Sequence, residues 1–170
     1  IIGQVIIASI FSYLAINWVN VSTELSFARP VTHGLPKWLF LIICIVIVIG
    51  AANAVTITDG LDGLASGSST LVFSAYAIIP FWQFRHPDLY SLGSLGYSQN
   101  ALDLSVLAVS IVGASAGFLW WNAAPAQIFM GDVGSLALGG ALAAFAIVTK
   151  TELLLVFLGG IYVVETLSVI

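Results

Sequence analysis

The chain has 170 residues, of which 60% are hydrophobic and only 7% are charged, and its formal net charge is −4 at pH 7. Soluble domains carry roughly a quarter charged residues, so this composition excludes an ordinary soluble domain and predicts an integral membrane protein. Its few basic residues form no cluster, which argues against nucleic acid as a partner. A single cysteine, Cys44, also excludes a disulfide framework.

Apolar runs predict an all-α fold, a polytopic membrane helical bundle with about six transmembrane helices. Runs of about 18 or more apolar residues are typical of membrane-spanning helices. The predicted spans cover residues 1–19, 38–55, 63–84, 102–120, 134–149 and 152–170. Lys150, in the turn between the last two, can extend towards lipid headgroups. We expect one membrane domain, 1–170, that is an internal segment of a longer protein, because the chain lacks an initial Met and ends within a helical pattern.

Two connecting loops hold carboxylates and no Lys or Arg. Residues 56–62 contain Asp59 and Asp62, and residues 121–133 contain Asp132. The first of these loops follows the second predicted span and the other follows the fourth, so both open on the same side of the membrane. Three carboxylates from distant parts of the sequence can therefore meet in one site.

The segment "TITDGLDGLASG" places Asp59 and Asp62 three residues apart. If both lie on the first turn of the third span, they share one helical face and repel unless a cation or proton joins them. Mg²⁺ suits such a place, because it is held by one or two carboxylates together with substrate phosphates, and a helix N-terminus favours phosphate. Ordinary N-capping is the alternative for Asp59, but it does not explain Asp62.

The segment "IFMGDVGSLALGG" repeats this design. Asp132 lies between Gly131 and Gly134 at the start of the fifth predicted span, and glycines permit close approach of backbone to a ligand. Capping alone is again the alternative. Two acidic, glycine-rich loops on one membrane face favour a shared metal–phosphate site.

Small residues recur at four-residue spacing within two of the predicted spans. Gly63 is followed by Gly67, and Gly113 is followed by Gly117. Such pairs let helix backbones approach closely in a membrane. We therefore expect both pairs to mark close helix packing rather than ligand contacts.

The segments "NAVTITDGLDGLASG" and "FLWWNAAPAQIFMGDVGSLALGG" resemble signature segments of the polyprenyl-phosphate N-acetylhexosamine-1-phosphate transferases. The resemblance covers nearly the whole chain except residues 20–37 and 85–101. Within that family, "GDVGSLALGG" and "LLLVFLGGIYVVETLSVI" resemble the branch that acts on UDP-N-acetylmuramoyl-pentapeptide (UDP-MurNAc-pentapeptide). The resemblance implies Mg²⁺-dependent transfer of phospho-N-acetylmuramoyl-pentapeptide to undecaprenyl phosphate, which gives lipid I and UMP in peptidoglycan synthesis.

The resemblance also implies roles for individual residues. Asp59, Asp62 and Asp132 would be the catalytic carboxylates, with Mg²⁺ on Asp132 and Asp59. The implied substrate-binding residues are Asn53, Thr56, Asn122, Phe129 and Gly131. Among these, Phe129 would stack on uracil and Asn122 would contact the nucleotide. An interfacial aromatic and a helix C-cap are the structural alternatives for those two residues.

The chain departs from the family pattern in two places. Thr56 stands where the family usually has Asn, and the family's paired-Asp motif and His-rich loop are both absent, so we expect this chain alone to be inactive. A sister transferase using another UDP-N-acetylhexosamine remains an alternative. An ion-coupled secondary transporter is a weaker one, because the carboxylates lie at span ends and no repeat is visible. A homodimer is left open.

The resemblance implies a multi-pass protein of the bacterial inner membrane, surrounded by lipid, with its motif loops facing the cytoplasm. The charges favour the opposite orientation, since basic loops are usually cytoplasmic. The basic residues Arg29, Lys37, Arg85 and Lys150 all fall on the other predicted face. Four charges are few, so we give precedence to the resemblance.

Overall fold

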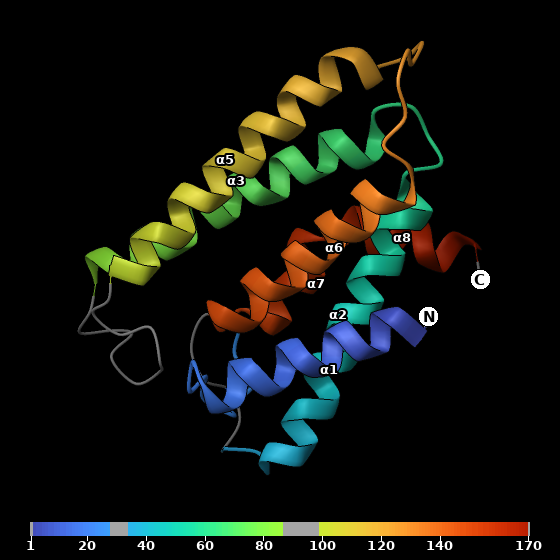
Figure 1. Cartoon of the computed structure of the whole chain (residues 1–170). Coiled ribbons are helices and arrows are strands. Elements are labelled where there is room, and N and C mark those ends of the chain that lie inside the picture. Colours follow the sequence, from blue (N-terminus) through green and yellow to red (C-terminus); the bar gives the residue numbers. More distant parts are fainter. Residues whose placement is uncertain (1, 28–33, 87–98, 170) are drawn as a thin grey trace.

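The computed structural model describes residues 2–27, 34–86 and 99–169, which are built mainly from helices (Figure 1). The helices are α1 (Ile2–Asn17), α2 (Lys37–Thr58), α3 (Leu64–Arg85), α5 (Gln99–Asn122), α6 (Gly131–Val148), α7 (Glu152–Leu158) and α8 (Gly160–Val169). Residues 1 and 170, which bound the first and last predicted spans, and Arg29 lie outside the described residues. The prediction of a polytopic helical bundle is confirmed.

The number of spans differs from the sequence prediction. By length and composition, four described helices can cross a membrane: α2, α3, α6 and the Ala101–Asn122 part of α5. Helix α1 has 16 described residues, whereas a span needs about 20. Helices α7 and α8 pass only as a pair bent by 73°, so the described residues supply four or five spans rather than six.

The bend between α7 and α8 falls at Gly159. Its N–H donates to the carbonyl oxygen of Leu155 at 2.7 Å, which closes the last turn of α7. A Cβ on Gly159 would lie 2.9 Å from that same oxygen, too close for a side chain. Absence of a side chain therefore permits the tight end of α7 from which α8 turns away.

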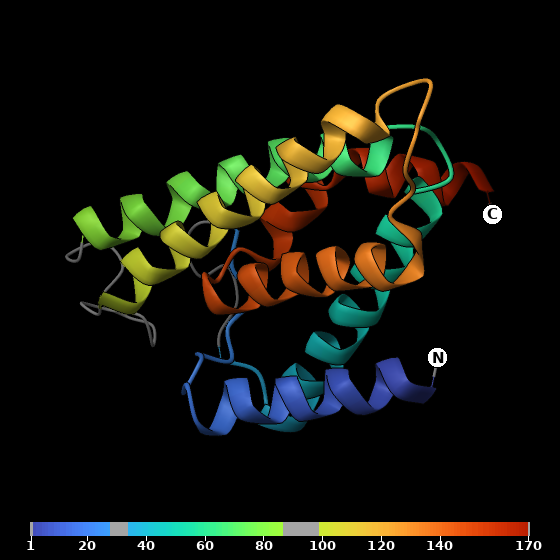
Figure 2. The ribbon, with the colours of Figure 1, turned by 45° about the horizontal axis from the view of Figure 1, so that its top comes forward.

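The helices pack as two main pairs. Helices α3 and α5 lie side by side in both ribbon views, and α2 crosses α6 (Figure 1, Figure 2). Helices α2 and α5 end at the same end of the molecule where α3 and α6 begin, so the connections 59–63 and 123–130 lie together. Counting spans predicted that the two motif loops open on one side of the membrane, and the structure brings them to one end of the molecule. We call this end the loop end.

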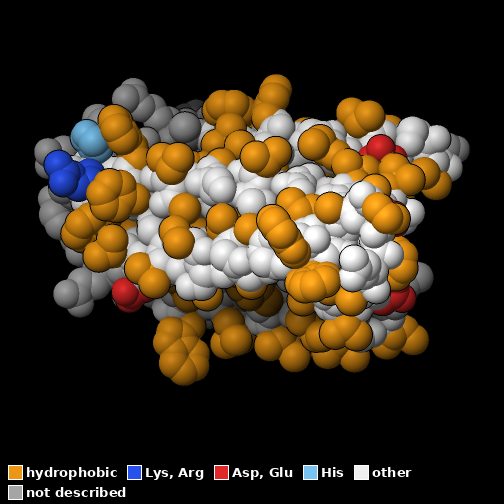
Figure 3. Space-filling model, turned by 90° about the horizontal axis from the view of Figure 1, so that it is seen from above, with side chains coloured by type: hydrophobic (Ala, Val, Ile, Leu, Met, Phe, Trp, Pro, Cys, Tyr) orange, Lys and Arg blue, Asp and Glu red, His pale blue; other side chains and the backbone are white. Residues whose placement is uncertain are grey.

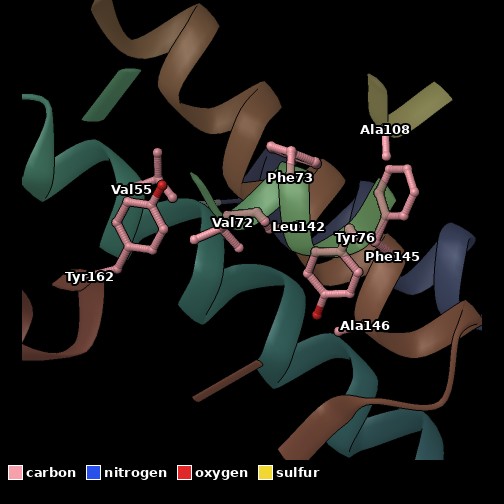
Figure 4. Close-up of a cluster of buried hydrophobic side chains, with 9 residues drawn as sticks. All are labelled: Val55, Val72, Phe73, Tyr76, Ala108, Leu142, Phe145, Ala146 and Tyr162. Atoms are coloured by element: carbon pink, nitrogen blue, oxygen red, sulfur yellow. The ribbon is translucent and has the colours of Figure 1, made fainter. Parts of the chain in front are cut away.

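Aromatic side chains of α3 and α6 hold the centre of the bundle. Phe73 packs edge-on against Phe145 at 5.7 Å between ring centroids, and Tyr76 lies 5.6 Å from the same ring. Such aromatic pairs add to the free energy gained by burial. The buried cluster draws on α2, α3, α5, α6 and α8 and contains Val55, Val72, Phe73, Tyr76, Ala108, Leu142, Phe145, Ala146 and Tyr162 (Figure 4).

Apolar side chains also cover the outside of the bundle. Large hydrophobic residues such as Leu71, Ile78 and Val109 are more than half exposed. Figure 3 shows hydrophobic side chains across the middle of the view and charged ones gathered towards its two ends. This arrangement suits a surface in contact with lipid, with charges near the membrane–water interfaces.

The turn between α6 and α7 holds an ion pair in which the Glu152 carboxylate is buried. Lys150 Nζ lies 2.6 Å from Glu152 Oε1 and also donates to the carbonyl oxygens of Ser22 (2.9 Å) and Glu24 (2.6 Å). It lies 4.5 Å above the centre of the Phe40 ring. Instead of extending to the headgroups, Lys150 therefore joins the segment after α1 to the α6–α7 turn.

The glycine pairs differ in their surroundings. A Cβ on Gly63 would meet Leu119 of α5 at 3.3 Å, and one on Gly67 would meet the same side chain at 3.9 Å, so this pair packs closely as expected. A Cβ added to Gly113 or Gly117 would meet nothing within 4 Å among the described residues. The expectation of close packing at that second pair is therefore wrong for the described part of the chain.

Candidate active site at the ends of α2 and α6

Asp59 caps the C-terminus of α2. Its N–H donates to the carbonyl oxygens of Val55 (3.0 Å) and Thr56 (3.3 Å), whereas α3 begins only at Leu64. Asp59 and Asp62 therefore do not both lie on the first turn of α3, the arrangement on which their shared helical face depended. Helix α2 continues farther than its apolar pattern indicated, and the chain then turns before α3.

That turn depends on Gly63, whose φ of +73° lies in the left-handed region. Glycine enters this region without the steric cost that a Cβ imposes. Gly63 is the residue before α3, and no side chain caps the helix there. N-capping by Asp59, the alternative left open by the sequence, is therefore excluded for α3.

Asp132 lies in the first turn of α6, directly after Gly131, whose φ is +66°. The N-cap position belongs to Met130, and no side chain forms a capping hydrogen bond there. Capping therefore does not account for Asp132. Its exposed carboxylate stands where the α6 N-terminus contributes partial positive charge and free N–H groups, which together favour an anionic ligand.

The structure brings Asp59 and Asp132 together from the ends of α2 and α6. Burial raises the pKa of the Asp59 carboxyl above its ordinary value, a hydrogen bond from the Gly131 backbone opposes this rise, and repulsion from Asp132 adds to it. Neighbouring carboxylates disfavour each other's charged form. A divalent cation between them would remove that repulsion, so this pair is the part of the site that fits a metal.

The third carboxylate, Asp62, connects the two motif loops. It is exposed, and its Oδ2 accepts a hydrogen bond of 3.1 Å from the Ala126 N–H. Within residues 2–27, 34–86 and 99–169, no group of three or more His, Cys, Asp or Glu is arranged to hold a metal ion. A hard cation at Asp59 and Asp132 would take its other ligands from phosphates or water, as Mg²⁺ commonly does.

Asn122 ties the same two loops together from inside. Its Oδ1 accepts hydrogen bonds from the Gly63 N–H (3.2 Å) and the Ser66 hydroxyl (2.8 Å), and its Nδ2 donates to the Ile128 carbonyl (2.9 Å). The side chain is buried, with 3% of the residue exposed. These contacts give Asn122 a structural task that the sequence did not indicate. Its nucleotide contact stays a prediction.

Phe129 lies at the loop end, three residues before Asp132, and is 70% exposed. An exposed aromatic ring beside a polar site can stack on a flat ligand such as a nucleobase. Gly131, between these two residues, presents its backbone to Asp59. Both predicted substrate-binding positions therefore lie near the carboxylate pair.

Asn53 lies one turn before Thr56 on α2, and its side-chain amide is occupied by other parts of the protein. Its Oδ1 accepts a hydrogen bond from Gln4 Nε2 (3.3 Å) in α1, and its Nδ2 donates to the Ile49 carbonyl (2.8 Å). The amide thus joins α1 to α2. Substrate binding by Asn53 stays a prediction.

Thr56 contacts a residue that the motifs did not single out. Its Oγ1 lies 3.1 Å from Ser135 Oγ on α6, so a hydroxyl pair joins α2 and α6 next to the carboxylates. Ser135 follows Asp132 by three residues, which puts both on one face of α6. That spacing was the signal available in the sequence.

Comparison with known proteins identifies the family. The model of glycosyl transferase family 4 matches residues 1–150. Three similar curated relatives are each named phospho-N-acetylmuramoyl-pentapeptide-transferase. They come from Frankia casuarinae (48% identity over 176 residues, 98% of this chain and 49% of the relative), Mycobacteroides abscessus (45% over 177, 99% and 49%) and Mycobacterium leprae (46% over 177, 99% and 49%).

The chain therefore spans about half the length of the curated relatives it matches. The two segments that carry the motifs, residues 53–67 and 118–140, both fall inside the matched range. The resemblance drawn from those motifs is confirmed at the level of the family. The chain belongs to glycosyl transferase family 4.

Proposed function

We propose that the protein carrying this chain is the phosphoglycosyl transferase of peptidoglycan synthesis that its relatives' names describe. A phosphate oxygen of undecaprenyl phosphate attacks the sugar-linked phosphorus of UDP-MurNAc-pentapeptide. The bond from that phosphorus to the oxygen of UMP breaks, so lipid I forms and UMP leaves. The observation that carries this proposal is that the end of α2, with Asp59, meets the start of α6, with Asp132, where the Thr56 and Ser135 hydroxyls lie 3.1 Å apart.

Asp59 and Asp132 would hold Mg²⁺ in this scheme. When bound, Mg²⁺ would neutralise the charge of the diphosphate, which is the main requirement of phosphoryl transfer. The N-terminus of α6 and the Gly131 backbone would face the phosphates, and Phe129 would stack on the uracil ring. Asp62 would keep the two loops in register through its hydrogen bond with Ala126.

The membrane setting suits one lipid substrate and one water-soluble substrate. Undecaprenyl phosphate would approach along the apolar outside of the bundle and present its phosphate at the loop end. We propose that the protein lies in the bacterial inner membrane with this end in the cytoplasm, where the soluble substrate would be. Lys150 carries little weight as an opposing topology signal, because its charge is paired with Glu152.

The first test is an activity assay on the natural protein that contains this chain, purified in detergent. Fluorescent UDP-MurNAc-pentapeptide, undecaprenyl phosphate and Mg²⁺ are expected to give labelled lipid and UMP. Asp132→Asn should slow UMP release by about 100-fold or more, because it removes charge stabilisation at the reacting phosphates. Asp103→Asn, an exposed carboxylate near the other end of α5, is the matched control.

Two results would change the proposal. UMP release by Asp132→Asn within twofold of the unaltered protein would remove Asp132 from the metal site. Turnover of UDP-N-acetylglucosamine in place of the muramoyl substrate would assign the protein to a sister transferase. Since the 170-residue chain lacks a paired-Asp motif and a His-rich loop, we expect the chain by itself to release no UMP.

A further inference from the structure

Helices α2 and α6 meet along a close seam that ends at the candidate site. Its tightest point is Gly139, where an added Cβ would lie 2.5 Å from both the Ala51 carbonyl oxygen and the Ala52 Cα. Four residues after Ala52 on α2 comes Thr56, and four residues before Gly139 on α6 comes Ser135. Their hydroxyl oxygens lie 3.1 Å apart. The two helices therefore run in opposite directions, with Gly139 facing Ala52 and Ser135 facing Thr56.

The same register continues to the carboxylates. Asp59 lies three residues after Thr56, and Asp132 lies three residues before Ser135. Steps of four and then three residues keep side chains on one face of a helix. The hydroxyl pair thus lies between the close contact at Gly139 and the two carboxylates, which repel each other.

The Thr56 and Ser135 hydroxyls have one proton each, and each hydroxyl lies near at least two acceptors. Thr56 Oγ1 lies 3.0 Å from the Ala52 carbonyl oxygen, and Ser135 Oγ lies 3.1 Å from the Gly131 carbonyl oxygen. A hydroxyl has one proton, so one of the pair donates to the other while its partner donates to its own helix. Ser135 is fully buried, at 0% exposure, so loss of the bond would not be repaired readily by water.

We infer that Ser135 is a positioning residue that acts through Thr56 to fix the separation of Asp59 and Asp132 for a single divalent cation. This rests on the proposed function, because it assumes that those two carboxylates bind the cation. Without the hydroxyl bond, repulsion between the carboxylates separates the ends of α2 and α6, and the cation binds more weakly. Ser135 also bonds the Gly131 carbonyl, so it helps to hold the residue whose backbone contacts Asp59.

The test measures Mn²⁺ binding to the full natural protein without substrates, by the loss of the electron paramagnetic resonance signal of free Mn²⁺. Ser135→Ala and Thr56→Val are each expected to weaken binding about 3- to 10-fold, the effect of one hydrogen bond. The double variant should bind Mn²⁺ about as weakly as whichever single variant binds it more weakly, because both substitutions remove the same hydrogen bond. Ser74→Ala is the matched control, since the Ser74 hydroxyl donates to the Thr70 carbonyl on its own helix.

A kinetic measurement separates positioning from general damage. In Ser135→Ala, the Mg²⁺ concentration that gives half-maximal UMP release should rise by the factor seen for Mn²⁺ binding. The turnover number at saturating Mg²⁺ should stay within about twofold, because the site is then filled and the same two carboxylates hold the cation. A fall in turnover at saturating Mg²⁺ with unchanged metal affinity would overturn the inference.

Other outcomes are equally decisive. Unaltered Mn²⁺ binding in Ser135→Ala, or fully additive losses in the double variant, would overturn the inference and leave the proposed function standing. An unaltered protein that binds no Mn²⁺ would overturn both the inference and the assignment of the cation to Asp59 and Asp132, whereas failure of the UMP-release assay would overturn the proposed function. If Ser135→Ala does not fold, Thr56→Ser, which keeps the hydroxyl, should bind Mn²⁺ more tightly than Thr56→Val, and equal binding by these two variants would overturn the inference.

Discussion

At the scale of single residues, Asn122 and Asp62 both form hydrogen bonds that join the two motif loops, Asn122 from the interior and Asp62 from the surface. The buried amide of Asn122 holds Gly63, Ser66 and Ile128 together, and the exposed carboxylate of Asp62 holds the Ala126 backbone. Neither hydrogen-bonding task follows from residue type alone, since Asn and Asp are both common in loops. Geometry around the site therefore depends on side chains that do not themselves need to contact a substrate.

Asn122→Ala should destabilise the protein by about 2 kcal/mol, because it leaves buried donors of the loop end without a partner. Thermal unfolding in detergent, followed by circular dichroism, measures the change. Asn17→Ala is the matched control, since the Asn17 amide is exposed and donates only to the Tyr13 carbonyl in its own helix. Equal unfolding midpoints for the two variants would contradict the role assigned to Asn122.

The raised pKa of Asp59 gives a prediction for pH. Because its folded-state pKa lies above the ordinary value, the charged carboxylate destabilises the folded protein. The contribution of the protonated Asp59 carboxyl to stability is complete below the ordinary pKa, and it disappears as pH rises through the raised pKa. Asp59→Asn should therefore raise the unfolding midpoint at pH 7 without divalent cations, and this gain should vanish at pH values where Asp59 is protonated.

The same shift affects cation binding. A cation must displace the proton from Asp59, so affinity for Mn²⁺ should fall as pH drops through the raised pKa, at a higher pH than for a carboxyl group in water. Titration of free Mn²⁺ at a series of pH values measures this. An affinity that is constant from pH 7 down to the ordinary range of Asp would contradict the proposed role of Asp59.

At the scale of helices, the crossing of α2 and α6 sets the site. They approach closely at Gly139, where an added Cβ would clash with the α2 backbone, and Gly139 belongs to neither of the glycine pairs that four-residue spacing singled out. In the pair of that kind in α5, a Cβ added to Gly113 or Gly117 would meet nothing within 4 Å among the described residues. Four-residue spacing identifies a helix face made of small residues, but only the position of a neighbouring helix decides whether that face packs against it.

Gly139→Ala should destabilise the protein by about 1–3 kcal/mol, because an added Cβ would force the backbones of α2 and α6 apart. Gly140→Ala is the matched control, since a Cβ there meets nothing within 4 Å among the described residues. Unfolding midpoints in detergent measure both. A neutral Gly139→Ala would show that the crossing can relax without cost.

At the scale of the whole molecule, the two ends differ in their polar chemistry. The loop end has carboxylates that repel each other, whereas the opposite end has the ion pair of Lys150 with the buried Glu152. Glu152 Oε2 also accepts a hydrogen bond of 3.2 Å from the Ser26 N–H. The proposed cation would lie at the loop end, whereas at the opposite end a lysine side chain already pairs with the carboxylate.

Lys150→Met should destabilise the protein by about 3–5 kcal/mol, because it leaves the buried Glu152 without its partner. The double variant Lys150→Met with Glu152→Gln should recover part of this loss, since no charge then remains buried. UMP release per folded molecule should stay unchanged, because the ion pair lies at the end away from the site. Unfolding midpoints together with activity per folded molecule measure these effects, and a single variant as stable as the unaltered protein would contradict this.

The sequence by itself determined the class of protein, the approximate helices and the meeting of the two motif loops. Helix formation and membrane insertion depend on local composition, and counting spans then decides which loops share a side. Tertiary structure alone decided that α2 continues to Thr58 with Asp59 as its cap, that Asn122 points inward, and that Ser135 meets Thr56. These features depend on how one helix is rotated and shifted against another, which is fixed by contacts between residues far apart in the chain.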